Sequence, residues 1–150
     1  AHDCVVGSNC VIVNNVLLAG EVEVGDWAII GGASAVHQFC RIGRHAMISG
    51  GSLVSKDVPP FVKAARFPIT FVGANFIGLR RRGFTPEQIG EIQDIFRIIF
   101  QDGHNYSRAC EIVTAQFPQS EIRDEIVSFI KSSKRGILKP YNATLADEVE

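Results

Sequence analysis

Residues 6–59 repeat a hydrophobic pattern with a period of six. From Val6 to Val54 every sixth residue is Ile, Leu or Val. The residue four places after each of these is small or valine, and the residue immediately after is often glycine. An amphipathic helix has a period of 3.6 and a half-buried strand a period of two, so neither gives this pattern. A six-residue repeat is typical of a parallel β-helix, in which each hexad forms one short strand and one bend.

Three hexads close one triangular coil of 18 residues, so the nine hexads of this segment predict three coils. We expect the aliphatic side chains to point inward and the small residues to fill the interior. Glycine at the second position of a hexad is expected to relieve a bend at positive φ. Residues 18 apart should stack on successive coils, about 4.8 Å apart. A bare first coil would present an open strand edge, so we expect further coils before Ala1 in the natural protein.

The rest of the chain reads as a transition followed by a small helical domain. We predict β-helix coils over residues 1–59, a proline-containing transition over 60–84, and helices over 85–150. Thr85, Pro86 and Gln88 match the start of a helix with a capping box. The apolar spacing predicts three helices, the third of which is expected to end at Gly136. Their inward faces are predicted to be Ile89, Ile92, Phe96 and Ile99; Tyr106, Cys110, Val113 and Phe117; and Ile122, Ile126 and Phe129.

Composition narrows the range of functions. The formal net charge of −1 gives no general attraction to nucleic acid or to a membrane surface. The sequence contains no run of about 18 apolar residues, which a membrane-spanning helix would need. The four cysteines form no CxxC pair and no dense pattern, which favours a reducing compartment. We therefore expect a cytoplasmic protein with no membrane span and no nucleic-acid partner.

The 18-residue spacing places candidate catalytic residues in one column. His2, Gly20 and Gln38 should lie above one another, with Asp3 and Glu21 in the neighbouring column and His37 on the other side. An imidazole beside a carboxylate is the usual arrangement of a general base. Because adjacent strand residues face opposite ways, Asp3 can contact His2 only if the pair sits at a bend. The bare amide of Gly20 can then donate to a developing oxyanion, and Gln38 can hydrogen-bond a sugar hydroxyl.

Several motifs resemble one known family. The segments "AHDC", "AIIGGASAVHQFC", "DVPPFV" and "NFIGLRRRGF" are similar to the C-terminal half of the UDP-N-acetylglucosamine O-acyltransferases, the first enzymes of lipid A synthesis. The resemblance implies a left-handed parallel β-helix with a helical appendage. It also implies a homotrimer with active sites between neighbouring subunits. In such enzymes a 3-hydroxyacyl chain moves from acyl carrier protein to the glucosamine 3-hydroxyl of the UDP-sugar.

The resemblance also assigns roles to residues of this chain. It implies that His2 is the general base, that Asp3 orients it, and that the amide of Gly20 stabilises the oxyanion. Gly50 matches a position that acts as a hydrocarbon ruler, and glycine there leaves room for a longer acyl chain. The arginine run also suits a diphosphate, because guanidinium binds phosphate in a bidentate manner. The implied substrate-binding residues are Gln38, His37 and Glu21 at the sugar, and Asn75, Arg81 and Arg82 at the nucleotide.

The sequence departs from the family pattern at two positions, and two further expectations concern cofactors and the carrier protein. Many members of the family have histidine where Glu21 stands and an acidic residue where Ile77 stands, so contacts to the sugar and to the uracil are expected to differ. Neither departure touches the base. No cofactor and no metal are implied. An acidic acyl carrier protein should meet basic residues, for which Arg41, Arg44 and Lys63 are the hypothesis.

Three alternative functions remain open at this point. A related hexapeptide N-acyltransferase would use an amine of a UDP-amino sugar as acceptor. A trimeric zinc lyase on the same scaffold would need three converging histidines, but His2, His37 and His45 do not share a column. Finally, the chain could be a non-catalytic β-helix scaffold whose polar patch is idle.

Overall fold

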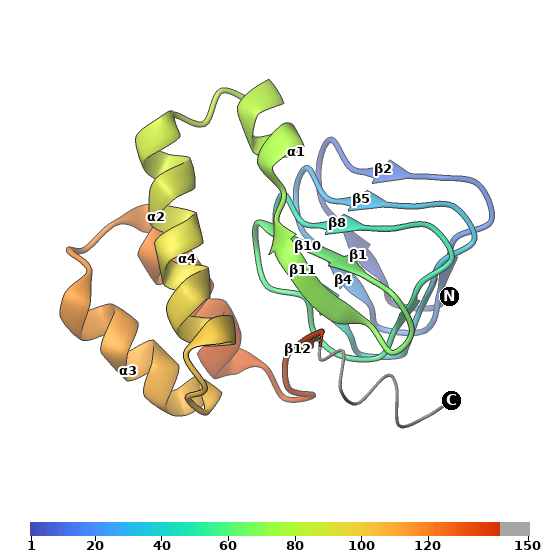
Figure 1. Ribbon diagram of the computed structural model, residues 1–150. Helices are drawn as coiled ribbons and strands as arrows, with labels where there is room; N and C mark the ends of the chain where they lie inside the picture. Colours follow the sequence, from blue (N-terminus) through green and yellow to red (C-terminus); the bar gives the residue numbers. More distant parts are fainter. Residues whose placement is uncertain (142–150) are drawn as a thin grey trace.

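A computed structural model describes residues 1–141 of the chain. Nine two-residue strands form three coils of a triangular prism, drawn from blue to green in Figure 1. One face carries β1–β4–β7, the second β2–β5–β8 and the third β3–β6–β9, all paired in parallel with the 18-residue register that the hexads predict. The strands are β1 Val5–Val6, β2 Val11–Ile12, β3 Leu17–Leu18, β4 Glu23–Val24, β5 Ile29–Ile30, β6 Ala35–Val36, β7 Arg41–Ile42, β8 Met47–Ile48 and β9 Leu53–Val54.

The interior of the prism is built from the residues that the repeat predicts. The aliphatic positions of the second and third coils are buried, and so are the small residues four places later. In the first coil the corresponding side chains, such as Val6 and Ile12, are partly exposed because that coil is covered on one side only. The expected fold class, a left-handed parallel β-helix followed by a small helical domain, is confirmed.

The expected reason for the hexad glycines is wrong. Within the repeat, the residues at positive φ are instead those at the fourth position of the first eight hexads, among them Asn9, Trp27 and His45. The second-position glycines are needed because the next coil passes very close. A Cβ on Gly25 would lie 2.6 Å from the amide nitrogen of Arg44, and one on Gly31 or Gly43 would also strike backbone atoms. Backbone cannot move aside as a side-chain end can, so this contact selects glycine.

The segment after the coils continues the second face of the prism. Strand β10 (Val62–Ala65) pairs in parallel with β8 and antiparallel with β11 (Thr70–Ala74), and β12 (Lys139–Pro140) adds beside β11. Helix α1 (Phe76–Arg81) follows directly and lies against the prism (Figure 1). The hairpin therefore fixes where α1 sits relative to the coils, which matters for the site described below.

Three further helices form a bundle beside the prism (Figure 1). Helix α2 (Pro86–Phe96) begins with the predicted capping box, in which Thr85 and Gln88 bond each other's backbone, and continues as a π-helical turn, η1 (Arg97–Gln101). Helices α3 (Tyr106–Gln116) and α4 (Glu121–Ser132) complete the bundle. The predicted inward residues are buried except Tyr106 and Phe117, which are half-buried.

Helix α4 ends four residues before Gly136, the predicted end. The hydroxyl of Ser133 donates to the buried carboxylate of Asp57, 2.7 Å away, and this bond turns the chain toward the prism. None of the helices in residues 1–141 is both long and apolar enough to cross a membrane. The division at 59/60 and 84/85 stays a prediction, and residues 142–150 of its last part lie outside the described residues.

Candidate active site

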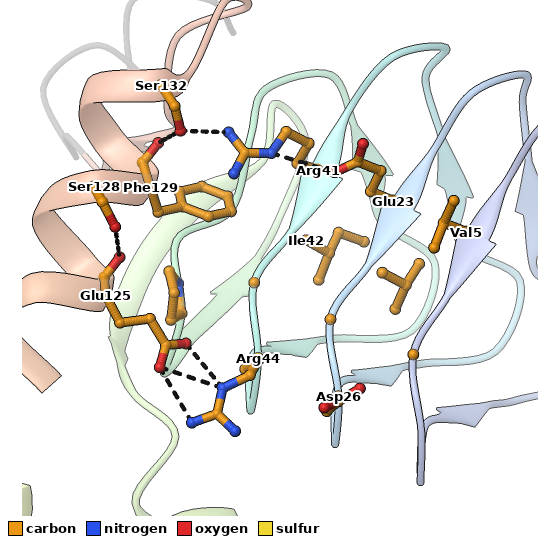
Figure 2. A pocket seen from close by; sticks show the side chains of 15 residues that line it. Val5, Glu23, Asp26, Arg41, Ile42, Arg44, Glu125, Ser128, Phe129 and Ser132 are labelled. Carbon is orange, nitrogen blue, oxygen red and sulfur yellow. Dashed lines mark hydrogen bonds and ion pairs between the residues drawn. The ribbon is translucent and has the colours of Figure 1, made fainter. Parts of the chain in front are cut away.

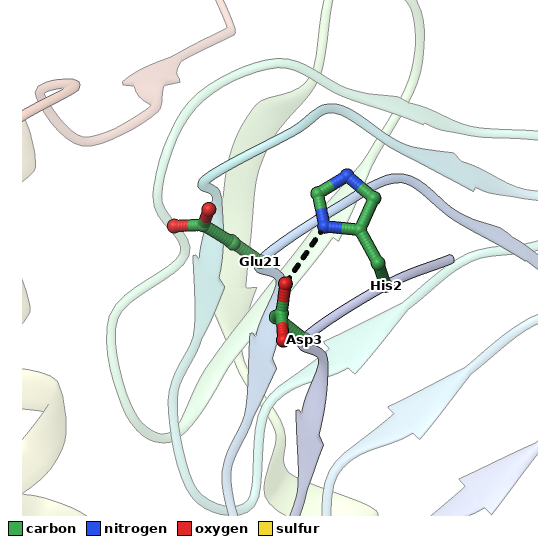
Figure 3. A group of neighbouring side chains, drawn as sticks. All are labelled: His2, Asp3 and Glu21. Carbon is green, nitrogen blue, oxygen red and sulfur yellow. Dashed lines mark hydrogen bonds and ion pairs between the residues drawn. The ribbon is translucent and has the colours of Figure 1, made fainter.

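The His-Asp pair lies just before β1, at the corner of the prism where, one coil further, Gly20 and Glu21 connect β3 to β4. Asp3 has φ 59°, and this turn brings its Oδ2 to 2.9 Å from Nδ1 of His2 (Figure 3). An ionised carboxylate only accepts hydrogen bonds, so Nδ1 carries the proton and Nε2 is the basic nitrogen. Both side chains are largely exposed. The contact between Asp3 and His2 was expected only if the pair sits at a bend, and the positive φ of Asp3 provides that bend.

Gly20 lies directly above the imidazole, as the 18-residue spacing predicts. A Cβ on Gly20 would lie 2.5 Å from Nε2 and 2.6 Å from Cε1 of His2, and 3.2 Å from the side-chain amide nitrogen of Gln38. Only glycine leaves room for the ring in this position. Within residues 1–141 no backbone carbonyl accepts the N–H of Gly20, so this amide is available to another acceptor. The column of His2, Gly20 and Gln38 is therefore present in the structure.

The remaining sugar-site candidates surround this column. The amide of Glu21 donates to the carbonyl of His2, and the Glu21 carboxylate lies with the His2 and Asp3 side chains in a group whose polar atoms are within 4.8 Å of one another. Among the described residues, these three side chains are the group whose polar atoms lie close enough together to bind one cation. His37 is exposed and its Nδ1 lies 3.0 Å from the carbonyl oxygen of Gln38. All six predicted residues of the patch thus gather at one corner.

Gly50 occupies a different corner, away from the imidazole. A Cβ there would have the carbonyl oxygen of Gly32 at 3.2 Å and no side chain within reach, and a Cβ on Gly32 would meet the carbonyl of Asn14 at 3.3 Å. The predicted column of these three residues is present. Because Gly50 is exposed and its φ is not positive, a larger side chain fits the backbone and would project outward.

The three nucleotide-site candidates lie on or beside α1. Asn75 is buried; its Oδ1 accepts from the amide of Gly78 as the N-cap of α1, and its Nδ2 donates to the carbonyl of His45 at 3.0 Å. Arg81 is exposed, whereas Arg82 is half-buried with its Cζ 5.2 Å above the ring of Trp27. Burial and the neighbouring Arg81 lower the pKa of Arg82. Asn75 therefore positions α1 on the prism.

A stack of aromatic rings supports Arg82, and reasoning from the sequence missed most of it. The rings of Trp27 and His45 are nearly parallel, with centroids 6.2 Å apart, and His45 stacks in turn on Phe61. Phe84 meets the His45 ring edge-on at 5.0 Å. The 18-residue spacing identifies the first pair, but Phe61 and Phe84 come from outside the repeat. One Arg82 nitrogen, Nη1, is buried without a hydrogen-bond partner among the described residues.

His45 makes folding stability depend on pH. Burial, with help from Arg44 and Arg82, lowers its pKa to about 4. The His45 imidazole is neutral in the folded protein. Its contribution to the free energy of unfolding is therefore complete above about pH 6.5, the ordinary histidine pKa, and is lost as the pH falls toward 4. The expected loss is roughly 2–4 kcal/mol of unfolding free energy. Denaturant unfolding at pH 7 and pH 4 measures it. His45→Phe keeps an aromatic ring, so its stability should fall less over this range; equal losses would contradict the assignment.

The structure does not favour Arg41 and Arg44 as contacts for an acidic carrier protein. Both line a groove of about 530 Å³ between α4 and the first face of the prism (Figure 2). Arg44 makes a bidentate pair with Glu125 at 3.0–3.2 Å. Arg41 pairs with Glu23 at 3.6 Å and lies over the ring of Phe129. Their charges are already matched within the chain. The coil register could have revealed the first pair, because Glu23 stands opposite Arg41 on the neighbouring coil. No local pattern could reveal the second, because Glu125 is 81 residues from Arg44.

The geometry at the His2 corner is that of a proton-abstracting site with an adjacent anion-stabilising donor. A basic imidazole nitrogen, fixed by a carboxylate, lies beside Gly20, whose N–H has no backbone acceptor among residues 1–141, and a carboxamide lies one coil further. These groups can deprotonate a hydroxyl or amine and stabilise the oxyanion that forms when it attacks a carbonyl.

Comparison with known proteins gives a consistent result. Residues 57–138 match the profile of a family described as UDP N-acetylglucosamine O-acyltransferase, domain 2. Among curated proteins, the acyl-[acyl-carrier-protein]–UDP-N-acetylglucosamine O-acyltransferase of Burkholderia lata is 42% identical over 142 residues, covering 92% of this chain and 54% of the relative. The protein of the same name from Thiobacillus denitrificans is 40% identical over 139 residues, covering 93% of this chain and 54% of the relative.

Solved structures agree in fold. A UDP-N-acetylglucosamine acyltransferase from Bacteroides fragilis superimposes with a TM-score of 0.91 at 47% identity, covering 93% of this chain and 55% of that one. The Arabidopsis enzyme of the same name gives 0.88 at 36% identity, covering 93% and 52%. The chain thus spans about half the length of the curated relatives and the solved structures that it matches.

Proposed function

Because the chain belongs to the UDP-N-acetylglucosamine O-acyltransferase family, we propose that it carries out acyl transfer from acyl carrier protein to the 3-hydroxyl of UDP-N-acetylglucosamine. The transferred group is a 3-hydroxyacyl chain, and the reaction is the first step of lipid A synthesis in the cytoplasm. The observation that carries the proposal is the His2–Asp3 pair with the amide of Gly20 above it.

In the proposed mechanism, Nε2 of His2 takes the proton of the sugar 3-hydroxyl as its oxygen attacks the thioester carbonyl. Asp3 holds the other ring nitrogen and stabilises the imidazolium that forms. The N–H of Gly20 donates to the carbonyl oxygen as it becomes negative. Collapse of the tetrahedral intermediate expels the carrier thiolate, which receives the proton from His2. No metal and no cofactor take part.

Substrate binding is assigned around this centre. Gln38, Glu21 and His37 bind the glucosamine, and Arg81 and Arg82 bind the diphosphate. Asn75, whose side chain is engaged in capping α1 and in the bond to His45, acts on the nucleotide through the position of α1 or through its remaining amide hydrogen and lone pair. Ile77, 63% exposed on α1, offers an apolar contact where many relatives offer a carboxylate.

The positions of these groups support a homotrimer with sites shared between subunits. The His2 column lies at the corner between the third and first faces of the prism. Arg82 lies over Trp27, at the corner between the first and second faces. One substrate held at its phosphates by α1 would reach the base more readily on a neighbouring copy than on the same chain.

Mixing two inactive variants tests the shared site. His2→Ala and Arg82→Ala, each expected to be poorly active alone, should regain part of the activity when co-expressed, because a mixed oligomer pairs an intact His2 with an intact Arg82. Activity of the purified mixed oligomers, with mass measured by light scattering, checks this. Mixtures no better than the separate variants, or a monomeric protein, would count against shared sites.

Gly50 is proposed to set the length of the acyl chain. Gly50→Met should lower the rate with long 3-hydroxyacyl donors by roughly tenfold or more while leaving shorter donors unaffected, the discrimination that a few carbons produce in an apolar groove. The side chain has room to project, since the three atoms nearest to a Cβ at this position are backbone atoms of Gly31 and Gly32, with the Gly32 carbonyl oxygen closest at 3.2 Å. Product masses from a mixed set of donors provide the measurement. An unchanged length distribution would remove Gly50 from the acyl site.

The proposed function is tested in the natural protein that carries this sequence. Acyl carrier protein bearing a 3-hydroxyacyl chain is supplied with UDP-N-acetylglucosamine or with its 3-amino analogue, and the products are identified by mass spectrometry. The ester is the expected product. Exclusive formation of the amide would instead favour the N-acyltransferase alternative, for which two carboxylates beside His2 would attract an ammonium group. No product from either acceptor would overturn acyl transfer.

A further inference from the structure

A second opening adjoins the His2 corner and leads to a set of cations that have no acidic partner among residues 1–141. It has a volume of about 740 Å³ and runs from Glu21 and Phe39 to Lys134 and Arg135. The Glu21 carboxylate belongs to the same group of polar atoms as His2 and Asp3. Glu21 therefore links this opening to the proposed catalytic pair beside it.

Three cations, Lys56, Lys134 and Arg135, form what we call the basic rim at the outer end. Lys56 continues the spacing of His2, Gly20 and Gln38, and its Nζ donates to the carbonyl of Arg135 at 3.0 Å. The Arg135 guanidinium donates to the carbonyl of Ser55 at 3.1 and 3.3 Å. These bonds hold the chain after α4 against the prism, so the rim is a fixed part of the opening.

No ion pair within residues 1–141 neutralises the charge of the basic rim. Within residues 1–141 none of its three cations lies within 4.0 Å of a carboxylate oxygen. Three acids line the same opening. Asp57 is 1% exposed and its oxygens accept from the amide of Arg41 and the hydroxyl of Ser133. Glu23 pairs with Arg41, and Glu21 lies with His2 and Asp3. By contrast, Arg41 and Arg44 are matched by Glu23 and Glu125.

From this arrangement we propose that the basic rim is where the acidic surface of the acyl-carrying protein docks, so that its acyl-bearing arm enters the opening toward His2. The inference rests on the proposed function, since it concerns the donor of that reaction. It replaces Arg41 and Arg44 of the sequence-based hypothesis, whereas Lys63, the third residue of that hypothesis, is exposed on β10 and stays a prediction. Exposed charges at an interface mainly steer encounter, so the rim acts on the apparent affinity for the carrier and on its salt dependence.

The test compares two donors in the natural protein that carries this sequence. One is the 3-hydroxyacyl chain on acyl carrier protein; the other is the same chain on pantetheine, which has no acidic surface. Lys134→Glu should raise the KM for the carrier-bound donor about three- to tenfold with little change in kcat, and Lys56→Glu combined with it should raise it further. The KM for the pantetheine donor should not change. Raising the salt concentration should weaken the wild type more than the variants.

Arg66→Glu is the matched control, because it makes the same charge change at an exposed position in the turn between β10 and β11, beside the second face of the prism. It should leave both KM values unaltered. An unchanged carrier KM in the double variant, an equal change for both donors, or an equal effect of Arg66→Glu overturns the inference while acyl transfer itself stands. A wild-type protein that uses neither donor overturns the proposed function and the inference together. Thermal unfolding verifies that each variant is folded.

Discussion

Replacing His2 with alanine is expected to lower kcat/KM for acyl transfer by about 10²–10⁴-fold, the usual contribution of a positioned general base. The loss should appear mainly in kcat, because His2 takes up the hydroxyl proton in the transition state. Gln38 and Arg82 remain to bind the sugar nucleotide. Folding should be unaffected, since the His2 side chain is 63% exposed. Steady-state kinetics together with thermal unfolding measures both.

Asp3→Asn is the companion variant. It keeps the size of the side chain but removes the charge that fixes the protonated Nδ1 of His2, 2.9 Å away, so a smaller loss than that of His2→Ala is expected. A His2→Ala protein with wild-type rates would instead mean that the polar corner is idle and would support the scaffold alternative.

Gly20→Ala is expected to cost about 10²-fold in kcat while leaving the fold intact, because an added Cβ would occupy the space of the His2 ring. The new carbon would lie 2.5 Å from Nε2. The ring is exposed and can swing aside, so the strain is relieved by displacing the base and not by shifting the coils. Misplacing a catalytic group by about 1 Å is enough for a loss of this size. Kinetics and unfolding free energies of the purified variant test the prediction.

Two further variants sharpen this test. Gly25→Ala makes the same chemical change in the next hexad, away from the site. There the added Cβ would meet the backbone nitrogen of Arg44 at 2.6 Å. It should therefore lose about 1–3 kcal/mol of stability, as forced overpacking does. The double variant His2→Ala/Gly20→Ala should be little slower than His2→Ala alone, because the two changes act through one ring. Additive losses would mean that Gly20 acts by another route, such as its amide.

Much of the fold and of the site follows from local patterns in the sequence. The hexads predict the three coils and their register, and the register then predicts that His2, Gly20 and Gln38 stack, as do Gly50, Gly32 and Asn14. The capping box at Thr85 and the inward residues of the helices are likewise local signals. A period and a cap can be read from neighbouring residues because the backbone repeats the same geometry each time.

Other features depend on contacts that no local pattern contains. The hexad glycines were assigned to bends at positive φ, but they are required by the backbone of the coil above. Arg44 was expected to be free for a partner, yet it pairs with Glu125 on α4, 81 residues later. Helix α4 was expected to reach Gly136, and Ser133 ends it earlier by bonding Asp57.

The sequence by itself determined a prism with an imidazole, a carboxylate and a bare amide gathered at one corner, because an 18-residue coil converts spacing directly into position. Only the tertiary structure decided which charges are left for partners. That outcome depends on how the helical bundle packs against the prism: packing pairs Arg44 with Glu125 and leaves Lys56, Lys134 and Arg135 without acids in the described residues, whereas Arg41 pairs with Glu23 inside the prism. A charge pair is set by distance in space, and the chain brings these groups together only after both domains have folded.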